Sequence, residues 1–307
     1  MNEREQNNSA SEAPQRDDGF TIMSKLIAEA VERIRSKKET PDAITGISTC
    51  FPGLNYYTSG LQRGDLIVVA GRPSMGKHSF VLNIVVHVAL ANELPVAILD
   101  NEMGGVTLAT RMIASIAKID CHDLLKGQIE CDESGRLGTA IDALTQAPIY
   151  FSSLTPLSVQ ELGEHLRGLN QRTGGLGLIV VDCLPELILT GEKMHDDCAI
   201  KIAHTSRYLK ALAMELNVPI VVLSPIERDL EERCNKRPSL TDLPGMAAIA
   251  NAADLVLLLY RDEIYNPESE EKGETTIIVS RNRGGSFGSF SLRYDVRYGS
   301  FAEIFYG

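Results

Sequence analysis

The sequence contains no tryptophan, and nowhere does it hold a long uninterrupted run of apolar residues. No window approaches the ~18 consecutive apolar residues that a membrane-spanning helix needs, so no membrane partner is expected. Residues 1–19 are polar and lack the apolar segment of a secretory signal. These absences argue against an integral membrane protein and against export.

Paired cysteines are also lacking. The six cysteines are scattered, none lies in a C-x-x-C pair, and the six histidines are equally dispersed, so no metal cluster is expected from their spacing. The pattern argues against a zinc site and a disulfide framework, and it favours a protein of the reducing cytoplasm. The cysteines are Cys50, Cys121, Cys131, Cys183, Cys198 and Cys234.

Basic residues are fewer than acidic ones: the sequence has 30 lysines and arginines and 41 acidic residues, so its net charge is −11. A nucleic-acid-binding protein normally carries a basic surface. The charge is therefore a mild argument against DNA binding, although it does not exclude a basic channel inside an assembly.

From Asp65 onward, short apolar runs alternate with helical segments. This alternation predicts an α/β fold with a mostly parallel central sheet covered by helices on both faces. The expected strands are Leu66–Ala70, Val96–Leu99, Ile149–Ser152, Leu178–Asp182, Pro219–Leu223 and Leu255–Tyr260. The expected helices are Ser79–Asn92, Thr107–Ala117, Ser134–Gln146, Val159–Arg172 and Ala199–Leu216. After Gly273, the segments "TTIIVS", "SFSLRY" and "SFAEIF" predict antiparallel strands at the C-terminal edge of the sheet.

A separate amphipathic helix is predicted near the N-terminus. Its apolar side chains recur at helical spacing, and a charged turn, "RSKKETPD", follows it. The stripe can pack on its own domain or on a neighbouring subunit, and both alternatives stay open. Residues 1–18 before it are expected to be a disordered leader. The stripe consists of Ile22, Met23, Leu26, Ile27, Ala30, Val31 and Ile34.

The segment "GRPSMGKHS" after the first predicted strand has the form of a phosphate-binding loop. Glycines let the backbone N–H groups surround phosphates at the start of the following helix, and the lysine adds a positive charge. The next position normally carries a Ser or Thr hydroxyl that coordinates Mg²⁺, but here it is His78. The residues expected to bind nucleotide are Gly71, Arg72, Pro73, Ser74, Met75, Gly76, Lys77, His78 and Ser79.

Acidic residues follow two of the predicted strands. Asp182 ends the run "LGLIVVD", at the strand edge where open α/β sheets bind ligands, so it is a candidate metal ligand; a helix-capping role is the alternative. Glu102 follows "AILD", where a carboxylate can orient and deprotonate water. Asp100 is an equal competitor for that role by strand periodicity alone.

Several phrases, taken in order, resemble the C-terminal, RecA-like motor domain of DnaB-type replicative DNA helicases. The resemblance runs from about residue 19 to the end of the chain. It rests on "AGRPSMGK", "RMIASIAKID", "SRYLKALAMELNVPIVVLS", "ADLVLLLYRDEIYNPES" and "RNRGGSFGSFSLRY". It implies a RecA-like P-loop ATPase that hydrolyses ATP with Mg²⁺, acts in DNA replication on single-stranded DNA, and assembles as a homo-oligomeric ring, most simply a hexamer.

The resemblance also implies roles for particular residues. Lys77 matches the Walker-A lysine, Asp182 the Walker-B acid and Glu102 the catalytic glutamate, which favours Glu102 over Asp100. Arg283 matches an arginine finger that reaches a neighbouring subunit's site, and Arg281 stands where a companion lysine is usual; without the resemblance, "SRNRGG" would be a charged hairpin turn.

The resemblance divides the chain as well. Residues 19–38 match the family's linker helix, and residues 39–307 match the RecA-like ATPase domain. From the resemblance we expect the short polar leader to stand in place of the family's N-terminal collar domain.

The departures from the family pattern fall on polar positions. His78 replaces the hydroxyl, Pro185 and Pro225 each replace a glutamine, and the DNA-facing loop at Asp242–Ile249 lacks an arginine and a glutamate. We expect impaired Mg²⁺ positioning and catalysis, and weakened DNA binding, although Lys126, Arg228 and Arg233 remain as possible DNA contacts.

Three functions remain open. The first is a DnaB-like ATP-driven helicase motor with a degenerate Walker-A motif. The second is a non-hydrolysing nucleotide-binding relative that assembles with, or regulates, a true replicative helicase or other replication proteins. The third is a RecA-like ATPase unconnected with replication.

Overall fold

The computed structural model describes residues 22–39, 44–100, 102–153, 158–182 and 198–304, and the chain divides into two units after Ala43. The described part of the first unit is helix α1 (Met23–Glu39), where the sequence predicts a helix. Its apolar side chains are exposed, with Met23 at 65%, Ile27 at 55% and Ile34 at 66%. The predicted leader lies outside the described residues.

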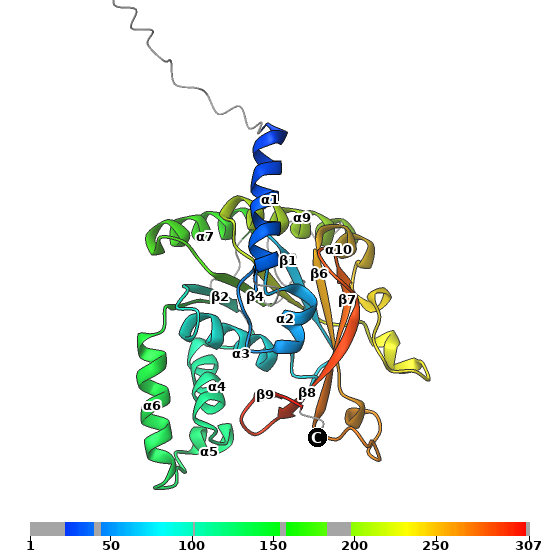
Figure 1. The fold of residues 1–307 in the computed structure, drawn as a ribbon. Coiled ribbons are helices and arrows are strands. Elements are labelled where there is room, and N and C mark those ends of the chain that lie inside the picture. The colour runs from blue at the N-terminus through cyan, green and yellow to red at the C-terminus, as the bar shows by residue number, and fades with distance from the viewer. Residues whose placement is uncertain (1–21, 40–43, 101, 154–157, 183–197, 305–307) are drawn as a thin grey trace, which may run out of the picture. The chain divides into compact units, whose positions relative to one another are not determined.

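A mixed sheet forms the centre of the second unit, in the strand order β3-β2-β4-β5-β1-β6-β7-β8-β9 (Figure 1). The strands from β3 to β6 run parallel, and β7, β8 and β9 join antiparallel at one edge, as predicted. The strands are β1 (Leu66–Ala70), β2 (Val96–Asp100), β3 (Ile149–Ser152), β4 (Leu178–Asp182), β5 (Ile220–Ser224), β6 (Leu255–Tyr260), β7 (Glu274–Asn282), β8 (Gly288–Asp295) and β9 (Ser300–Glu303).

The helices of this unit include the five that the sequence predicts. Three short ones, α2, α5 and α10, are additional, and none of the described helices has the length and apolar character to cross a membrane. The α-helices are α2 (Pro52–Thr58), α3 (Lys77–Leu90), α4 (Gly105–Ala117), α5 (Cys121–Lys126), α6 (Glu133–Gln146), α7 (Val159–Thr173), α9 (Cys198–Leu216) and α10 (Met246–Ala252). The 3₁₀ turns are η1 (Arg228–Glu232), η2 (Leu240–Asp242) and η3 (Asp262–Ile264).

The predicted loop at Asp242–Ile249 needs correction. Its second half is the start of α10, whose Ile249 is buried, and Gly245 begins this helix in the left-handed conformation at φ 59°. A side chain at Gly245 would press on Ile202 of α9, with carbons 3.1 Å away. Within this stretch only residues 243–245 are therefore irregular, because Asp242 ends η2.

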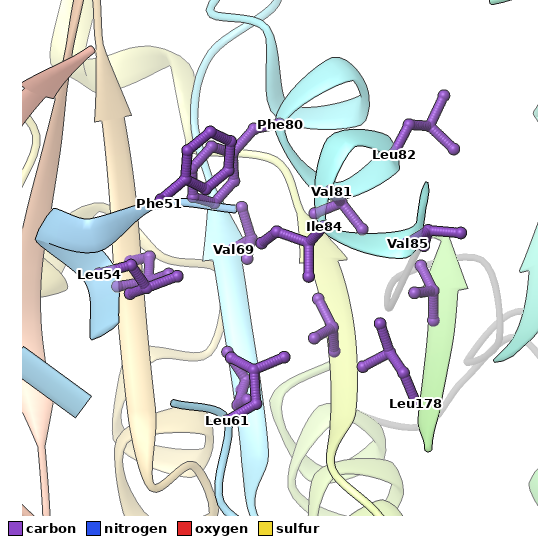
Figure 2. Packing of buried hydrophobic residues seen from close by; sticks show 14 of the residues in the cluster. Phe51, Leu54, Leu61, Val69, Phe80, Val81, Leu82, Ile84, Val85 and Leu178 are labelled. Atoms are coloured by element: carbon purple, nitrogen blue, oxygen red, sulfur yellow. The ribbon is translucent and has the colours of Figure 1, made fainter. Parts of the chain in front are cut away.

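The core is divided between the two faces of the sheet, because successive residues of a strand point to opposite sides. In β1, Ile67 and Val69 pack on the face covered by α2, α3 and α4, whereas Leu66, Val68 and Ala70 pack on the face covered by α7, α9 and α10. Figure 2 shows the first face, where the rings of Phe51 and Phe80 stack with centroids 4.8 Å apart.

Candidate functional site

The glycine-rich loop lies between the carboxyl end of β1 and helix α3. Gly76 precedes the helix at φ 87°, a conformation that disfavours side chains, and a Cβ there would lie 3.0 Å from the Phe301 ring. No side chain caps the N–H groups of the first turn of α3, which lack acceptors within the helix. Lys77 begins the helix and donates from Nζ to the Gly71 carbonyl oxygen at 2.7 Å. The loop therefore has the form that binds phosphate groups.

This loop lines one side of a cavity of about 510 Å³. Seven of the nine residues predicted to bind nucleotide line it, together with Glu102 and Asp182. Gly71 and Met75 do not: both are buried, and the Met75 sulfur accepts a hydrogen bond from the Arg261 backbone N–H at 3.3 Å. A neighbouring cavity of about 220 Å³ shares Ser79, Arg111, Tyr294 and Val296 with the first.

His78, in the first turn of α3, lies between the two acidic residues of the site. Its Nε2 is 2.6 Å from Oδ2 of Asp182 and 3.5 Å from Oε2 of Glu102. The 2.6 Å approach is a charge contact, because within the described residues neither Nε2 of His78 nor Oδ2 of Asp182 has a partner with hydrogen-bonding geometry. One imidazole nitrogen and two carboxylate oxygens, all of them possible metal ligands, thus lie within 4.8 Å of one another. The spacing of the histidines in the sequence did not predict this cluster.

The two acids that compete for the water-activating role have different surroundings. Asp100, 2% exposed, is paired with Asp182 across β2 and β4, and its Oδ1 accepts from the backbone N–H groups of Glu102 and Met103, both at 2.8 Å. Glu102 keeps 59% of its side chain exposed at the edge of the cavity. Asp100 thus shapes the turn, and Glu102 is the carboxylate that faces the cavity.

Burial and charge shift two pKa values in this group. Close contact with the Asp182 carboxylate raises the pKa of His78, and burial opposes that shift. Burial raises the pKa of Asp100, and the Asp182 charge adds to the effect. The Asp182 carboxylate thus raises the pKa of both His78 and Asp100 at this edge of the sheet.

The Mg²⁺ ion that the resemblance implies fits these side chains poorly. Mg²⁺ takes oxygen ligands in near-ideal octahedral geometry, and Asp182 and Glu102 offer such oxygens. The position that follows the loop lysine, however, presents the imidazole nitrogen of His78, which occupies the space beside the buried Asp182 oxygen.

Sequence reasoning missed Arg261, which follows β6 directly. It is 6% exposed, lines the cavity, and donates from Nη1 to the Ser74 carbonyl oxygen at 2.8 Å. Its guanidinium lies 5.0 Å from the centre of the Tyr294 ring. The signal was available, because Arg261 follows a predicted strand at the same edge as Asp182 and Glu102. Arg261 therefore holds the loop through Ser74, and its guanidinium is also paired with the Glu263 carboxylate, to which Nε donates at 3.1 Å.

Arg281 and Arg283 lie near the amino ends of the parallel strands, opposite the end where the glycine-rich loop lies. Arg283 donates its backbone N–H to the Asp254 carbonyl oxygen at 2.9 Å, and its Nη1 lies 3.4 Å from Oδ1 of the same residue, just before β6 begins. Arg281 donates from Nε to the Ala253 carbonyl oxygen at 2.9 Å. Five-residue β1 separates this edge from the loop by roughly 15 Å, so both arginines lie far from the loop.

Asp65, just before β1, belongs to the charged group around Asp254. Its neighbours are Lys210, with Nζ 3.8 Å from Oδ1, and the charges of Asp254 and Arg283. Burial and the Asp254 charge raise the pKa of Asp65 from 3.8 to about 6. An acid whose pKa is raised on folding destabilises the folded state as the pH rises through that range.

Replacing Asp65 by asparagine is therefore expected to stabilise the protein at neutral pH. The free energy of unfolding should exceed that of the wild type by about 1–2 kcal/mol near pH 7. The difference should shrink as the pH falls below about 6 and disappear only below 3.8, where Asp65 is neutral in the unfolded chain as well. Urea unfolding between about pH 3 and pH 7 measures it. A difference that does not change with pH would contradict the assignment.

Of the cations proposed to contact DNA, Arg233 is engaged within the chain. Its Nη2 lies 2.9 Å from Oδ2 of Asp242. Lys126 is exposed in the last turn of α5. Pro225 lines the cavity, and Pro185 lies outside the described residues. The positive charge of Arg233 is thus partly neutralised by the Asp242 carboxylate.

The chain matches a known protein family over most of its length. A family profile described as the DnaB-like helicase C-terminal domain matches residues 46–303. The chain is 36% identical over 307 residues to the replicative DNA helicase DnaB of Haemophilus influenzae, covering 98% of this chain and 63% of that protein. It is 36% identical over 283 residues to the DnaB of Pasteurella multocida, covering 91% and 60%. The chain thus spans just over three-fifths of the length of these relatives.

Two solved structures have the same fold. One is the ATPase domain of another protein, which superposes with a TM-score of 0.87 at 28% identity, covering 93% of this chain and 99% of that one. A DnaB-like replicative helicase, described together with its interactions with primase, superposes with a TM-score of 0.82 at 29% identity, covering 94% and 68%.

Proposed function

We propose, from the premise that this chain belongs to the family of DnaB-like helicase C-terminal domains, that it is the nucleotide-driven motor of a replicative DNA helicase. The observation that carries the proposal is the cavity of about 510 Å³ in which the glycine-rich loop faces Glu102 and Asp182. Because the matched relatives are longer than this chain, the activity, substrate and partners of the whole helicase are part of the proposal.

ATP is the nucleotide that we assign to the cavity. The backbone N–H groups at the start of α3 and the ammonium of Lys77 bind its phosphates. The base then lies in the adjoining cavity of about 220 Å³, beside the ring of Tyr294 and the side chain of Arg111. Arg261 supports the loop through its bond to the Ser74 carbonyl oxygen.

Glu102 is the residue that we assign to water activation. Its carboxylate is exposed to the cavity, and its turn is fixed by the two backbone N–H groups that Asp100 accepts. It orients the attacking water and takes its proton as the bond to the terminal phosphate breaks. Arg283, at the far edge of the sheet, acts on the site of a neighbouring subunit, which requires a homo-oligomer, most simply a ring.

A single assay tests this function. Phosphate release from ATP is measured with and without single-stranded DNA, in parallel with binding of a fluorescent ATP analogue. We expect saturable binding, hydrolysis that single-stranded DNA stimulates, and loss of hydrolysis without loss of binding in Glu102→Gln. No binding of the analogue at any concentration tested would contradict the proposal.

Tight binding without hydrolysis would support a second function, that of a non-hydrolysing relative that assembles with or regulates a true helicase. The observation that favours it is the position of His78, which replaces the usual hydroxyl and contacts Asp182 at 2.6 Å.

Helix α1 is proposed to be the linker that docks on the adjacent subunit. Deleting residues 1–38 removes most of this helix and its exposed apolar stripe, so the oligomer should shift towards monomer. Light scattering at tens of micromolar protein measures the shift. Deleting residues 1–21 alone leaves the helix intact and should preserve the oligomer. A monomeric full chain in the presence of an ATP analogue would contradict the docking role.

A further inference from the structure

The side chains of His78, Asp182 and Glu102 form a candidate metal site of unusual composition. One ligand atom from each residue lies within 4.8 Å of the other two. We propose that this site holds a borderline divalent transition metal of the Zn²⁺ class, bound by one imidazole nitrogen and two carboxylate oxygens, in place of the Mg²⁺ that the fold implies. The role of the metal rests on the proposed nucleotide function. Binding of the metal does not, because all three ligands belong to the chain itself.

The distances between the ligand atoms suit such an ion after a small adjustment. Zinc bonds of about 2.0–2.2 Å to nitrogen and oxygen place tetrahedral ligand atoms roughly 3.4 Å apart. The separation of Nε2 of His78 from Oε2 of Glu102 is already 3.5 Å. The 2.6 Å contact between Nε2 and Oδ2 of Asp182 must open by less than about 1 Å.

A second observation points to a ligand at this position. The Asp182 side chain is 5% exposed, and its Oδ2 lacks a partner with hydrogen-bonding geometry among the described residues. A buried carboxylate oxygen in that condition is costly unless a cation or a donor satisfies it. A metal between Oδ2 and Nε2 bonds to both atoms, whereas the 2.6 Å contact gives Oδ2 a charge partner without hydrogen-bonding geometry.

The chemistry of the donors selects the class of metal. Imidazole suits zinc, nickel, copper and iron, whereas Mg²⁺ takes oxygen donors and keeps its waters. Zinc sites with three protein ligands keep a further position open. Here that position faces the cavity of about 510 Å³, so an oxygen of a bound phosphate or a water molecule can occupy it.

The test is a Co²⁺ titration of the chelator-treated full chain without nucleotide, because Co²⁺ replaces Zn²⁺ and gives a visible ligand-field spectrum. We expect one equivalent to bind with a nitrogen–oxygen spectrum and to be displaced by Zn²⁺ but not by equimolar Mg²⁺. His78→Thr should weaken binding by about 100-fold or more, since changes even in outer-shell partners cost 10–100-fold. Asp182→Asn is a second variant that should lose the site, and a thermal melt checks that each variant is folded.

A matched control is His122→Ala, which changes an exposed histidine outside the cavity and should bind Co²⁺ as the wild type does. Unchanged binding in His78→Thr, a spectrum dominated by thiolate ligands, or absence of binding would each overturn the proposal and leave His78 as a simple charge partner of Asp182. Binding of the ATP analogue in EDTA, measured separately, reports on the nucleotide function. Failure of the metal site is therefore distinguishable from failure of that function.

Discussion

Replacing Lys77 by alanine is expected to weaken ATP binding by at least about 100-fold, because hydrogen bonds to charged groups contribute roughly 1.5–3 kcal/mol each and the ammonium can make more than one with the terminal phosphates. In the free protein Nζ bonds to the Gly71 carbonyl oxygen at 2.7 Å and thus already lies across the loop. Titration of a fluorescent ATP analogue in EDTA measures the loss without involving a metal ion.

The nucleotide series provides an internal check on this effect. AMP has no β- or γ-phosphate, so its affinity should change far less than that of ATP. Lys126→Ala is a matched control, since this lysine is exposed in α5 and does not line the cavity. Equal losses for ATP and AMP would indicate a general distortion of the loop and would contradict the assigned role of Lys77.

The loop and the strands around it could be predicted because their signals are local. The runs at Leu66–Ala70 and Leu178–Asp182 are buried along their whole length, so an unbroken apolar run reveals both their type and their ends. A phosphate-binding loop consists of consecutive residues, and Gly76 at its end has φ 87°, a backbone conformation that favours glycine. Both features were confirmed at the predicted positions.

Short helices were not predictable in the same way. Helix α5 spans six residues and owes its start to Asp120, whose side chain accepts from the His122 backbone N–H at 2.8 Å. Helix α10 has seven residues, and its buried Ile249 packs with the cluster that includes Ile202 of α9. Helices of this length carry too few turns for a periodic signal, and tertiary packing decides whether they form.

The least predictable feature of the candidate site is the meeting of His78 with Asp182 and Glu102. These residues are separated by 24 and 80 positions along the chain, and only the parallel pairing of the strands brings them to one edge. Sequence reasoning recognised His78 as an unusual residue and judged it by its chemistry alone. The structure adds that it contacts both acids, and from this contact follows the proposed change in metal preference.

The residues assigned to the proposed reaction lie at opposite ends of the parallel strands, so two subunits would supply them. The loop, Glu102 and Asp182 lie at the carboxyl ends of the parallel strands, whereas Arg283 lies beside Asp254 at the amino end of β6. A subunit can therefore supply a cavity to one neighbour and an arginine to the other. Such a head-to-tail arrangement closes into a ring when the rotation between subunits permits it.

Replacing Arg283 by alanine is accordingly expected to lower ATP turnover by about 10³–10⁵-fold, the range for removal of an arginine finger from other phosphoryl-transfer enzymes. Affinity for the ATP analogue should stay within about threefold, because the arginine stabilises charge that develops in the transition state. The measurement is phosphate release at saturating ATP, in the divalent ion that gives the highest wild-type turnover. Arg297→Ala is the matched control, since this arginine is 65% exposed and pairs with Asp295.

Mixing two inactive variants tests whether Arg283 acts between subunits. Glu102→Gln retains the arginine and lacks the proposed base, whereas Arg283→Ala retains the base and lacks the arginine. In randomly mixed rings about a quarter of the interfaces combine an intact cavity with an intact arginine, so a measurable share of activity should return. If both residues act within one subunit, no interface is complete and the mixture stays inactive. An inactive mixture, with subunit exchange confirmed by labelled protein, would show that Arg283 stabilises the chain through Asp254 and is not a finger.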